Sequence, residues 1–354
     1  MENMNKLSRR QFFMRSAQTA AGILAATTVT SCTSAEKPSA YDNDNLTEHI
    51  NMVTWYEVDA GWPEKPKKFE WGAVPGVAVD KKNNIWICTR TKPHVQVYSP
   101  DGKFIKAWNH ISLKAAHYMK IDHENNIWLS DCGDHFIRKC TQDGKILLTL
   151  GTPGQAGEDE THLNKPTDIA ISPTGDLFVS DGYGNNRIVH FDAKGRFIKQ
   201  WGTKGVKPGQ FNIPHAIEMD SAGRLYVADR NNARVQIFDQ NGNFLAQWRD
   251  LIVPWGLWVS DNDDIWVCGC SPMRYRENTN FLSCPPKDQL VARFNTDGKM
   301  LQLWTFPKGQ DNKEKSGELN WLHGIALDSK GNLYLGDIIG KRAQKFTKHT
   351  DPKA

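Results

Sequence analysis

A short pattern recurs six times between residues 70 and 346, and this repetition limits the possible folds more than any other feature of the sequence. Each unit begins with an alternating apolar strand that ends in Asp or Ser. A turn then leads to a second strand with an aromatic residue, as in residues 85–88 (IWIC). A third strand and a Gly-containing turn such as Asp101-Gly102 follow, often with a fourth strand. Because repeated four-stranded units pack against their neighbours around a channel, we predict an all-β fold, a six-bladed β-propeller.

The units also predict the domain boundaries. The propeller is expected to cover residues 51–347 and to be followed by a tail at residues 348–354. The sixth unit has only three recognisable strands, and the strand-like residues 52–56 are expected to supply its fourth strand and close the ring. Residues 32–50 are polar and contain proline, which is typical of a tether.

The first 31 residues have the pattern of a targeting segment. Residues 8–13 (SRRQFF) form a twin-arginine signature. A weakly apolar stretch at residues 17–29 then leads to a bacterial lipoprotein cleavage box that ends at Cys32. The apolar stretch is too short and too rich in Thr, Gln and Gly to span a bilayer. We therefore predict a twin-arginine lipoprotein signal peptide at residues 1–31 and a lipid on Cys32. The exported protein would be anchored to a membrane, in the periplasm or at the cell surface.

The charge of the chain gives no indication of a nucleic-acid partner. The leader contains four of the 44 basic residues and one of the 40 acidic residues, so the remaining chain is close to neutral. We expect a monomer. Two pairs of cysteines, each within one repeat, are candidates for disulfides after export: Cys132 with Cys140, and Cys270 with Cys284.

One position in each unit, five residues before the Asp or Ser that ends the first strand, is expected to lie beside the channel. In chain order this position holds Pro75, His117, Thr167, His215, Trp255 and His323. The three histidines fall on alternate units, about a third of a turn apart in a six-bladed ring. They would converge on the axis, as in a three-histidine metal site with an open fourth position. Neutral imidazole favours Zn²⁺, although other divalent transition metals accept the same ligands. The alternative is that each histidine only caps a strand or fills the mouth of the channel.

Polar residues that follow the second strands are expected at the same end of the repeat. Arg90 and Arg230 occupy matching positions in units one and four, and unit three has one extra residue in this turn, which pushes Tyr183 out of the blade. Two guanidiniums and a phenol that face a metal suit a substrate with a carboxylate next to a hydroxyl. The alternative is that the arginines are solvated surface residues. Four aspartates recur at the ends of second strands, where we expect them to stabilise turns: Asp131, Asp181, Asp229 and Asp337.

At these positions the sequence resembles the peptidyl-α-hydroxyglycine α-amidating lyase (peptidylamidoglycolate lyase) family, and its repeats resemble the NHL class. The similarity is densest at residues 166–187 and 208–230, which include the segments PTD, SDGY, PGQF and ADR, and it extends more weakly over residues 70–346. The resemblance implies a six-bladed propeller with zinc on His117, His215 and His323. It also implies a catalytic role for Tyr183 and for the two arginines, Arg90 and Arg230.

The activity that the resemblance implies is that of a zinc-dependent carbon–nitrogen lyase. Such an enzyme cleaves a small-molecule or peptide substrate with an N-acyl-α-hydroxyglycine-like end to a primary amide and glyoxylate. Tyr183 would take the proton of the substrate hydroxyl, with its pKa lowered by an arginine such as Arg90. Arg230 would hold the carboxylate.

The sequence departs from the family at two kinds of position. Members of the family have an aspartate after the third histidine that helps to bind a structural Ca²⁺. This chain has Gly324 there, so the resemblance does not support a calcium site. Two family disulfides are also missing as complete pairs, with Asn164 and Gly184 in place of one and Tyr226 and Ile237 in place of the other.

Two other functions use the same features. A non-catalytic NHL propeller would bind a protein or glycan at the cell surface through its loops, including residues 271–287. A zinc-dependent hydrolase would use the three histidines to activate a water molecule for attack on an ester or lactone. Tyr183 between two arginines favours the lyase over the hydrolase, and histidines on alternate units favour an enzyme over a binding module.

Overall fold

The computed structural model describes residues 54–272 and 288–350. The predicted signal peptide, Cys32 and the tether lie outside the described residues, as do Cys284 and most of the loop at residues 271–287. Apart from the short 3-10 helix η2 (Arg230–Asn232), the described chain is built from strands and their connections. None of its helices has the length and apolar character needed to cross a membrane.

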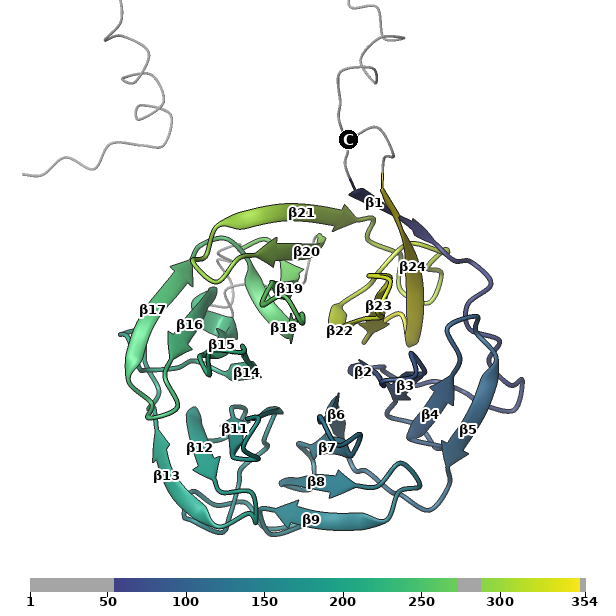
Figure 1. The fold of residues 1–354 in the computed structure, drawn as a ribbon. Helices are drawn as coiled ribbons and strands as arrows, with labels where there is room; N and C mark the ends of the chain where they lie inside the picture. The colour runs from purple at the N-terminus through teal and green to yellow at the C-terminus, as the bar shows by residue number, and fades with distance from the viewer. Residues whose placement is uncertain (1–53, 273–287, 351–354) are drawn as a thin grey trace, which may run out of the picture. The chain divides into compact units, whose positions relative to one another are not determined.

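Six four-stranded antiparallel sheets surround a central channel, as the sequence predicts (Figure 1). From the channel outward, blade one contains β2 (Gly76–Val79), β3 (Ile85–Cys88), β4 (Val95–Tyr98) and β5 (Phe104–Trp108), and blade two β6 (Ala116–Ile121), β7 (Ile127–Asp131), β8 (Phe136–Cys140) and β9 (Ile146–Leu150). Blade three contains β10 (Asp168–Ile171), β11 (Leu177–Asp181), β12 (Arg187–Phe191) and β13 (Phe197–Trp201), and blade four β14 (Pro214–Met219), β15 (Leu225–Asp229), β16 (Arg234–Phe238) and β17 (Phe244–Arg249). Blade five contains β18 (Val253–Val259), β19 (Ile265–Cys270), β20 (Gln289–Phe294) and β21 (Met300–Phe306).

The last blade joins the two ends of the described chain. Its inner strands are β22 (Leu322–Leu327), β23 (Leu333–Asp337) and β24 (Arg342–Thr350), and its outermost strand is β1 (Thr54–Val58). Thr54 pairs with Thr350 and Val58 with Phe346. Residues 348–350 therefore belong to the sheet, whereas the sequence places them in a tail, because β1 provides partners for these additional backbone groups.

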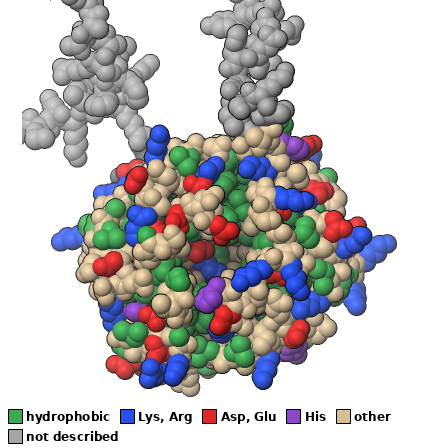
Figure 2. Space-filling model, viewed as in Figure 1, with side chains coloured by type: hydrophobic (Ala, Val, Ile, Leu, Met, Phe, Trp, Pro, Cys, Tyr) green, Lys and Arg blue, Asp and Glu red, His purple; other side chains and the backbone are tan. Residues whose placement is uncertain are grey.

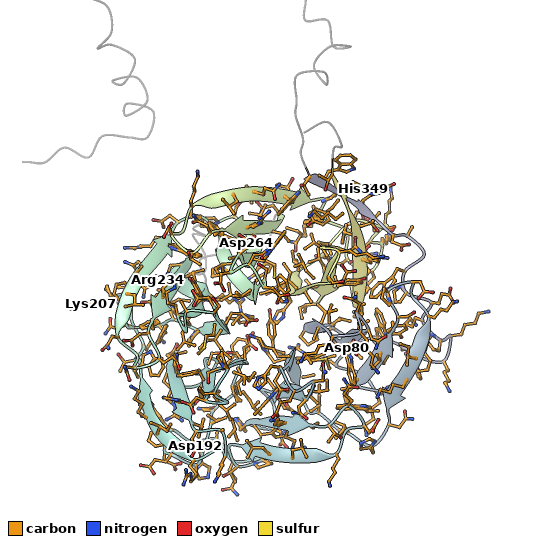
Figure 3. The ribbon with its side chains drawn as sticks, viewed as in Figure 1. Asp80, Asp192, Lys207, Arg234, Asp264 and His349 are labelled. Atoms are coloured by element: carbon orange, nitrogen blue, oxygen red, sulfur yellow. The ribbon has the colours of Figure 1, made fainter. Side chains whose placement is uncertain are left out.

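An aromatic residue and an aspartate link the two inner strands in four of the blades. In blades one and two, the indole Nε1 of Trp86 donates to Asp80 Oδ2 at 3.1 Å, and that of Trp128 donates to Asp122 Oδ2 at 2.9 Å. In blades four and six a tyrosine hydroxyl replaces the indole as the donor: Tyr226 donates to Asp220 and Tyr334 to Asp328. The ring thus fills the core while its polar atom fixes the turn between the strands, which explains the recurring aromatic residue of the sequence pattern. Asp80, the acceptor in blade one, is labelled in Figure 3.

Cys132 and Cys140 do not form a disulfide; both are free thiols. They belong to one hairpin, but Cys140 pairs with Ile127 and Phe136 with Asp131. Cys132 follows directly after Asp131, so the two thiols lie at opposite ends of the β7–β8 pair. At about 3.3 Å per residue this separation is far beyond the reach of a disulfide. The predicted pairing within this repeat is wrong for that reason.

Candidate metal centre

The structure brings the three register histidines together at one point of the channel. His117, His215 and His323 are the second residues of the innermost strands β6, β14 and β22. Their ring centroids are 4.7, 4.8 and 4.8 Å apart, close to an equilateral triangle, and one nitrogen of each ring lies within 4.8 Å of the others. All three side chains are buried. We call the end of the channel where the innermost strands begin the upper end, and the other the lower end.

A β-bulge in each of the three innermost strands that carry a histidine takes this residue out of the regular ladder. In blade two the register shifts between Ala116 and Met119, and in blade four between Pro214 and Ile217. In blade six it shifts between Leu322 and Gly324, on either side of His323. A bulge adds a residue without a cross-strand partner and redirects its side chain, so the ring can point along the axis instead of into the neighbouring blade.

Backbone carbonyls of the other three blades orient the imidazoles. Nδ1 of His117 lies 2.8 Å from Thr167 O, Nδ1 of His215 lies 2.6 Å from Trp255 O, and Nδ1 of His323 lies 2.7 Å from Pro75 O. A carbonyl only accepts, so each Nδ1 carries the proton and each Nε2 presents a lone pair to the channel. Thr167, Trp255 and Pro75 are the register positions without histidine. All six positions therefore contribute to one site, three by ligands and three by carbonyls that fix the ligand tautomer.

The recurring aspartates hold the loops that enter the innermost strands. Asp131 accepts hydrogen bonds from Lys114 N at 2.6 Å and Ala115 N at 2.9 Å, directly before β6. Asp229 accepts one from Asn212 N at 2.7 Å, before β14. Asp337 does the same for Asn320 N at 2.6 Å, before β22, and Asp181 for Asn164 N at 2.8 Å. Their role is structural, as predicted, and in the three histidine blades they position the strand start that carries the ligand.

Burial keeps the three imidazoles neutral. It lowers the pKa values of His117 and His215 well below the usual value, and it lowers the pKa of His323 to about 3. The positive charge of Arg230 acts in the same direction on all three pKa values, and that of Arg90 on those of His117 and His323. Neutral imidazole is the form that binds metal.

The donor set fits a divalent transition ion better than it fits an arrangement without one. Tyr183 Oη lies 3.1 Å from His117 Nε2 and 2.9 Å from His215 Nε2. The hydroxyl has one proton, so it satisfies at most one of these two acceptors. A buried acceptor without a donor is costly, whereas a cation placed among three inward lone pairs engages all of them.

Tyr183 comes from the longer turn of blade three, between β11 and β12. The sequence suggests that a neighbouring arginine lowers its pKa, but the structure gives the opposite direction. Burial raises the pKa of Tyr183 and outweighs the lowering effects of Arg230 and Arg90. Arg230 also acts more strongly than Arg90, which the sequence singled out. The correction arises because the phenol is enclosed between imidazoles, and such enclosure cannot be read from its neighbours in the chain.

Both predicted arginines lie at the upper end, but in different settings. Arg230 opens η2, its backbone N–H donates to Ile213 O at 3.1 Å, and its side chain is buried. It interacts with Tyr183 through its charge and a hydrogen bond, and its Nε has no partner. Arg90 is exposed and its Nε donates to Ala116 O at 3.0 Å, beside His117. Arg230 is thus available to bind an anion within the site, and Arg90 lies at the rim.

Sequence reasoning missed an aromatic wall beside Arg230. Trp321 stacks on Trp255 with ring centroids 5.5 Å apart, and the guanidinium carbon of Arg230 lies 5.8 Å from the Trp321 ring centre. Trp321 has φ 82°, a left-handed conformation that disfavours a bulky side chain. The equivalent Lys165 and Ile213 share it, with φ 57° and 63°. The signal available in the sequence was position: Trp321 lies two residues before a ligand, where the loop meets the channel mouth.

Fold, repeats and site together define the chain as an NHL-repeat six-bladed propeller with a three-histidine site on its axis. The NHL repeat family matches residues 163–191 and 211–238. Human NHL repeat-containing protein 3 is 34% identical over 209 residues, which cover 55% of this chain and 60% of that protein. The mouse peptidyl-glycine alpha-amidating monooxygenase is 36% identical over 211 residues, 57% of this chain and 20% of that protein.

The resemblance to amidating lyases is confirmed by a further relative. A Caenorhabditis elegans protein named probable peptidyl-alpha-hydroxyglycine alpha-amidating lyase is 30% identical over 203 residues, which cover 56% of this chain and 53% of that protein. The chain thus spans less than two thirds of the length of these relatives. Among solved structures, a streptogramin B lyase shares the fold, with a TM-score of 0.55 and 13% identity over 84% of this chain and 99% of that one.

The positions at which the resemblance places two disulfides are adjacent here, although no cysteines occupy them. A Cβ built on Gly184 would lie 2.1 Å from Cγ of Asn164, and Tyr226 pairs with Ile237 across β15 and β16. The geometry at these positions therefore agrees with the resemblance.

Proposed function

We propose that this protein is a zinc-dependent carbon–nitrogen lyase that cleaves an N-acyl-α-hydroxyglycine-like compound to a primary amide and glyoxylate. The observation that carries the proposal is the convergence of three inward Nε2 atoms, the Tyr183 hydroxyl and the buried Arg230 at one end of the channel. Similarity to proteins named amidating lyases supports the reaction class.

His117, His215 and His323 would hold the ion. A bound dication supplies Lewis-acid chemistry, since it withdraws electron density from coordinated oxygens and stabilises the ionised form of a nearby hydroxyl. That effect would oppose the burial that raises the pKa of Tyr183. The carbonyl-bound Nδ1 atoms prevent the rings from turning away from the axis.

Arg230 would orient the substrate through its carboxylate. Its guanidinium is buried, and its unpartnered Nε lacks the hydrogen bond that a carboxylate oxygen can accept. Trp321, which is partly exposed and stacks on the buried Trp255, provides an apolar surface next to it for the acyl portion. Arg90, at the rim, adds positive charge that attracts an anionic substrate.

Tyr183 would transfer the proton. In its ionised form the phenolate accepts the proton of the substrate hydroxyl, the C–O bond becomes the carbonyl of glyoxylate, and the C–N bond breaks. The phenol then returns the proton to the departing amide nitrogen, so no oxidant or co-reactant is consumed. The contacts of its oxygen with Nε2 of His117 and of His215 support this role.

The test is glyoxylate release from N-benzoyl-α-hydroxyglycine by the purified protein, with metal content measured on the same sample. We expect release that a chelator abolishes and Zn²⁺ restores, and that His215→Ala eliminates. His123→Ala is the matched control, because His123 is exposed and lies at the lower end of the channel. Release of glyoxylate that survives both the chelator and His215→Ala would contradict the metal site. A metal-loaded protein that releases none would contradict the lyase.

We further propose that the chain is exported by the twin-arginine route and anchored through a lipid on Cys32, as its first residues indicate. Cys32→Ser should move the protein from the membrane fraction to the soluble fraction of the source cells. An unchanged membrane fraction would contradict the anchor.

A further inference from the structure

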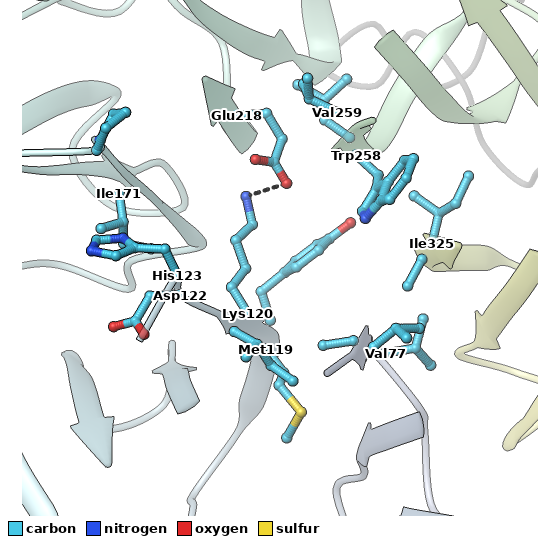
Figure 4. Close-up of a pocket in the computed structure, with 17 residues that line it drawn as sticks. Val77, Met119, Lys120, Asp122, His123, Ile171, Glu218, Trp258, Val259 and Ile325 are labelled. Atoms are coloured by element: carbon cyan, nitrogen blue, oxygen red, sulfur yellow. Dashed lines mark ion pairs between the residues drawn. The ribbon is translucent and has the colours of Figure 1, made fainter. Parts of the chain in front are cut away.

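The lower end of the channel opens into a second cavity, distinct from the histidine site. It has a volume of about 510 Å³, and residues of all six blades line it (Figure 4). Figure 2 shows a hollow at the centre of the ring with charges of both signs around it. A cavity of this size accommodates a small organic molecule.

Tyr118 separates this cavity from the histidines. Its buried side chain lines the cavity, and its hydroxyl donates to His323 O at 3.0 Å. Its ring centroid lies 5.8 Å from that of His117 and 5.5 Å from that of His323. A ligand in the lower cavity would therefore contact Tyr118, and Tyr118 in turn packs against two of the proposed metal ligands.

One wall of the cavity carries one cationic and two acidic side chains. Lys120 Nζ lies 3.0 Å from Asp168 Oδ2 and 2.8 Å from Glu218 Oε1, and it also donates to Ile217 O. An ammonium has three N–H donors, so these three acceptors use all of them. One cation faces two carboxylates, and Figure 4 marks its pairing with Glu218. With both carboxylates ionised, the cluster has an excess of negative charge and no free donor on Lys120.

Glu218 is the member of this cluster that a ligand can reach. Its side chain is 18% exposed and lines the cavity, whereas that of Asp168 is 0% exposed. A carboxylate has two oxygens, and Lys120 engages Oε1. Oε2 is thus available to accept a hydrogen bond from a ligand.

Apolar side chains form most of the rest of the cavity, which Asp122 and His123 also line. Ile121, Ile171, Val259 and Ile325 line it together with the partly exposed indole of Trp258 (Figure 4). An indole face attracts a cation, and an aliphatic wall favours an apolar body. At this cluster an anion would meet two carboxylates and a Lys120 without a free donor, which disfavours it.

We propose that the lower cavity binds a small amphipathic primary ammonium, with its charged head at Glu218 and its apolar body against Trp258. This site is independent of the lyase chemistry, because Tyr118 separates the two ends of the channel.

The proposal can be tested at pH 8, where Glu218 is ionised, by calorimetric titration of the full-length protein with three probes that share one body. Phenethylammonium carries a cationic head, 2-phenylethanol a neutral one and phenylacetate an anionic one. We expect phenethylammonium to bind at one site, 2-phenylethanol to bind about tenfold or more weakly, and phenylacetate not to bind. A hydrogen bond to a charged group accounts for a difference of this size.

Variants then locate the site. Glu218→Gln should weaken phenethylammonium binding about 10- to 100-fold, with little effect on 2-phenylethanol. His215→Ala, at the upper end, should leave phenethylammonium binding unchanged. Stronger binding of phenylacetate, unchanged affinity in Glu218→Gln or loss of binding in His215→Ala would overturn the proposal. If Glu218→Gln does not fold, Trp258→Leu decides, because it should weaken the ammonium more than the alcohol through loss of the cation–π contact.

Discussion

The two ends of the channel solve the problem of buried polar groups in opposite ways. At the lower end the chain provides its own cation: burial lowers the pKa of Lys120, but Asp168 and Glu218 more than compensate and hold it above the usual value. At the upper end three neutral imidazoles turn their acceptors inward, and the nearest hydroxyl, that of Tyr183, has one proton to offer. The lower end therefore pairs its buried carboxylates with a cation of the chain itself, whereas the upper end is arranged for a metal cation from outside the chain.

The largest effect expected at the upper end is catalytic. Tyr183→Phe removes the proton-transferring oxygen but none of the imidazole nitrogens, so kcat should fall by about 10²- to 10⁴-fold. Metal content should stay that of the unmodified protein, because the histidines are held by carbonyls and not by Tyr183. The check is a steady-state glyoxylate assay beside elemental analysis. A loss of less than tenfold with full metal content would remove Tyr183 from the proton transfer.

At the lower end the largest effect should be on stability. Lys120→Met leaves Asp168 as an uncompensated buried charge and should lower the free energy of unfolding by about 3–5 kcal/mol. Urea unfolding measures the change. The matched control is the triple variant Lys120→Met, Asp168→Asn, Glu218→Gln, which removes all three charges and should recover most of the loss. A loss below about 1 kcal/mol in the single variant would show that the cluster is not the internal ion pair described here.

The sequence predicts most of the residues that converge at the upper end and few of those at the lower end. Six similar units predict the blade count, and a fixed offset from the strand-ending Asp or Ser predicts that His117, His215 and His323 share a register. The register of a residue depends only on its own unit, so it can be read from the sequence. By contrast, Lys120 meets Asp168 and Glu218 from two other blades, and their convergence depends on how the ring closes.

Other features escaped prediction because they belong to the backbone or to packing. The carbonyls that orient the imidazoles and the bulges that carry them have no side-chain signature. The raised pKa of Tyr183 follows from burial among residues of other blades, which overrides the arginine effect that sequence suggests. Likewise the left-handed Trp321 occurs in a loop whose course is fixed by Asp337 through Asn320 N–H.

A matched pair of variants tests the strain at the mouth of the upper end. Trp321→Ala and Trp321→Gly both remove the indole beside Arg230, and they differ by one Cβ at φ 82°. The glycine variant should unfold with a free energy about 1–2 kcal/mol higher than the alanine variant, because only glycine adopts this conformation without steric cost. Urea denaturation of both proteins gives the difference. Equal stability would mean that the loop relaxes and stores no strain.

The same pair should also separate binding from chemistry. If the indole only contacts the acyl portion of the substrate, both variants should raise KM for N-benzoyl-α-hydroxyglycine with little change in kcat. A fall in kcat at constant KM would instead place Trp321 in the chemical step.

The last effect is the pH dependence of stability that the lower end produces. Burial raises the pKa of Glu218 from 4.5 to about 7. The charge of Lys120 lowers this pKa and that of Asp168 raises it, and Tyr118 also faces the carboxyl. The folded chain therefore keeps a proton that the unfolded chain releases above pH 4.5, so this contribution to stability is complete below pH 4.5 and is lost as the pH rises through 7. Between pH 5 and 8 the unmodified protein should lose about 2–3 kcal/mol relative to Glu218→Gln.

The control for this titration is Asp122→Asn. The pKa of Asp122 is lowered, chiefly by the Trp128 indole against the opposing effect of burial, so its carboxylate is ionised in both states across this pH range. Its difference from the unmodified protein should stay constant from pH 5 to 8. The comparison cancels other groups such as Asp337, whose pKa burial also raises to about 7, because they titrate equally in all three proteins. A constant difference for Glu218→Gln as well would mean that Lys120 keeps Glu218 ionised, and the lower end would then hold its full negative charge at every pH measured.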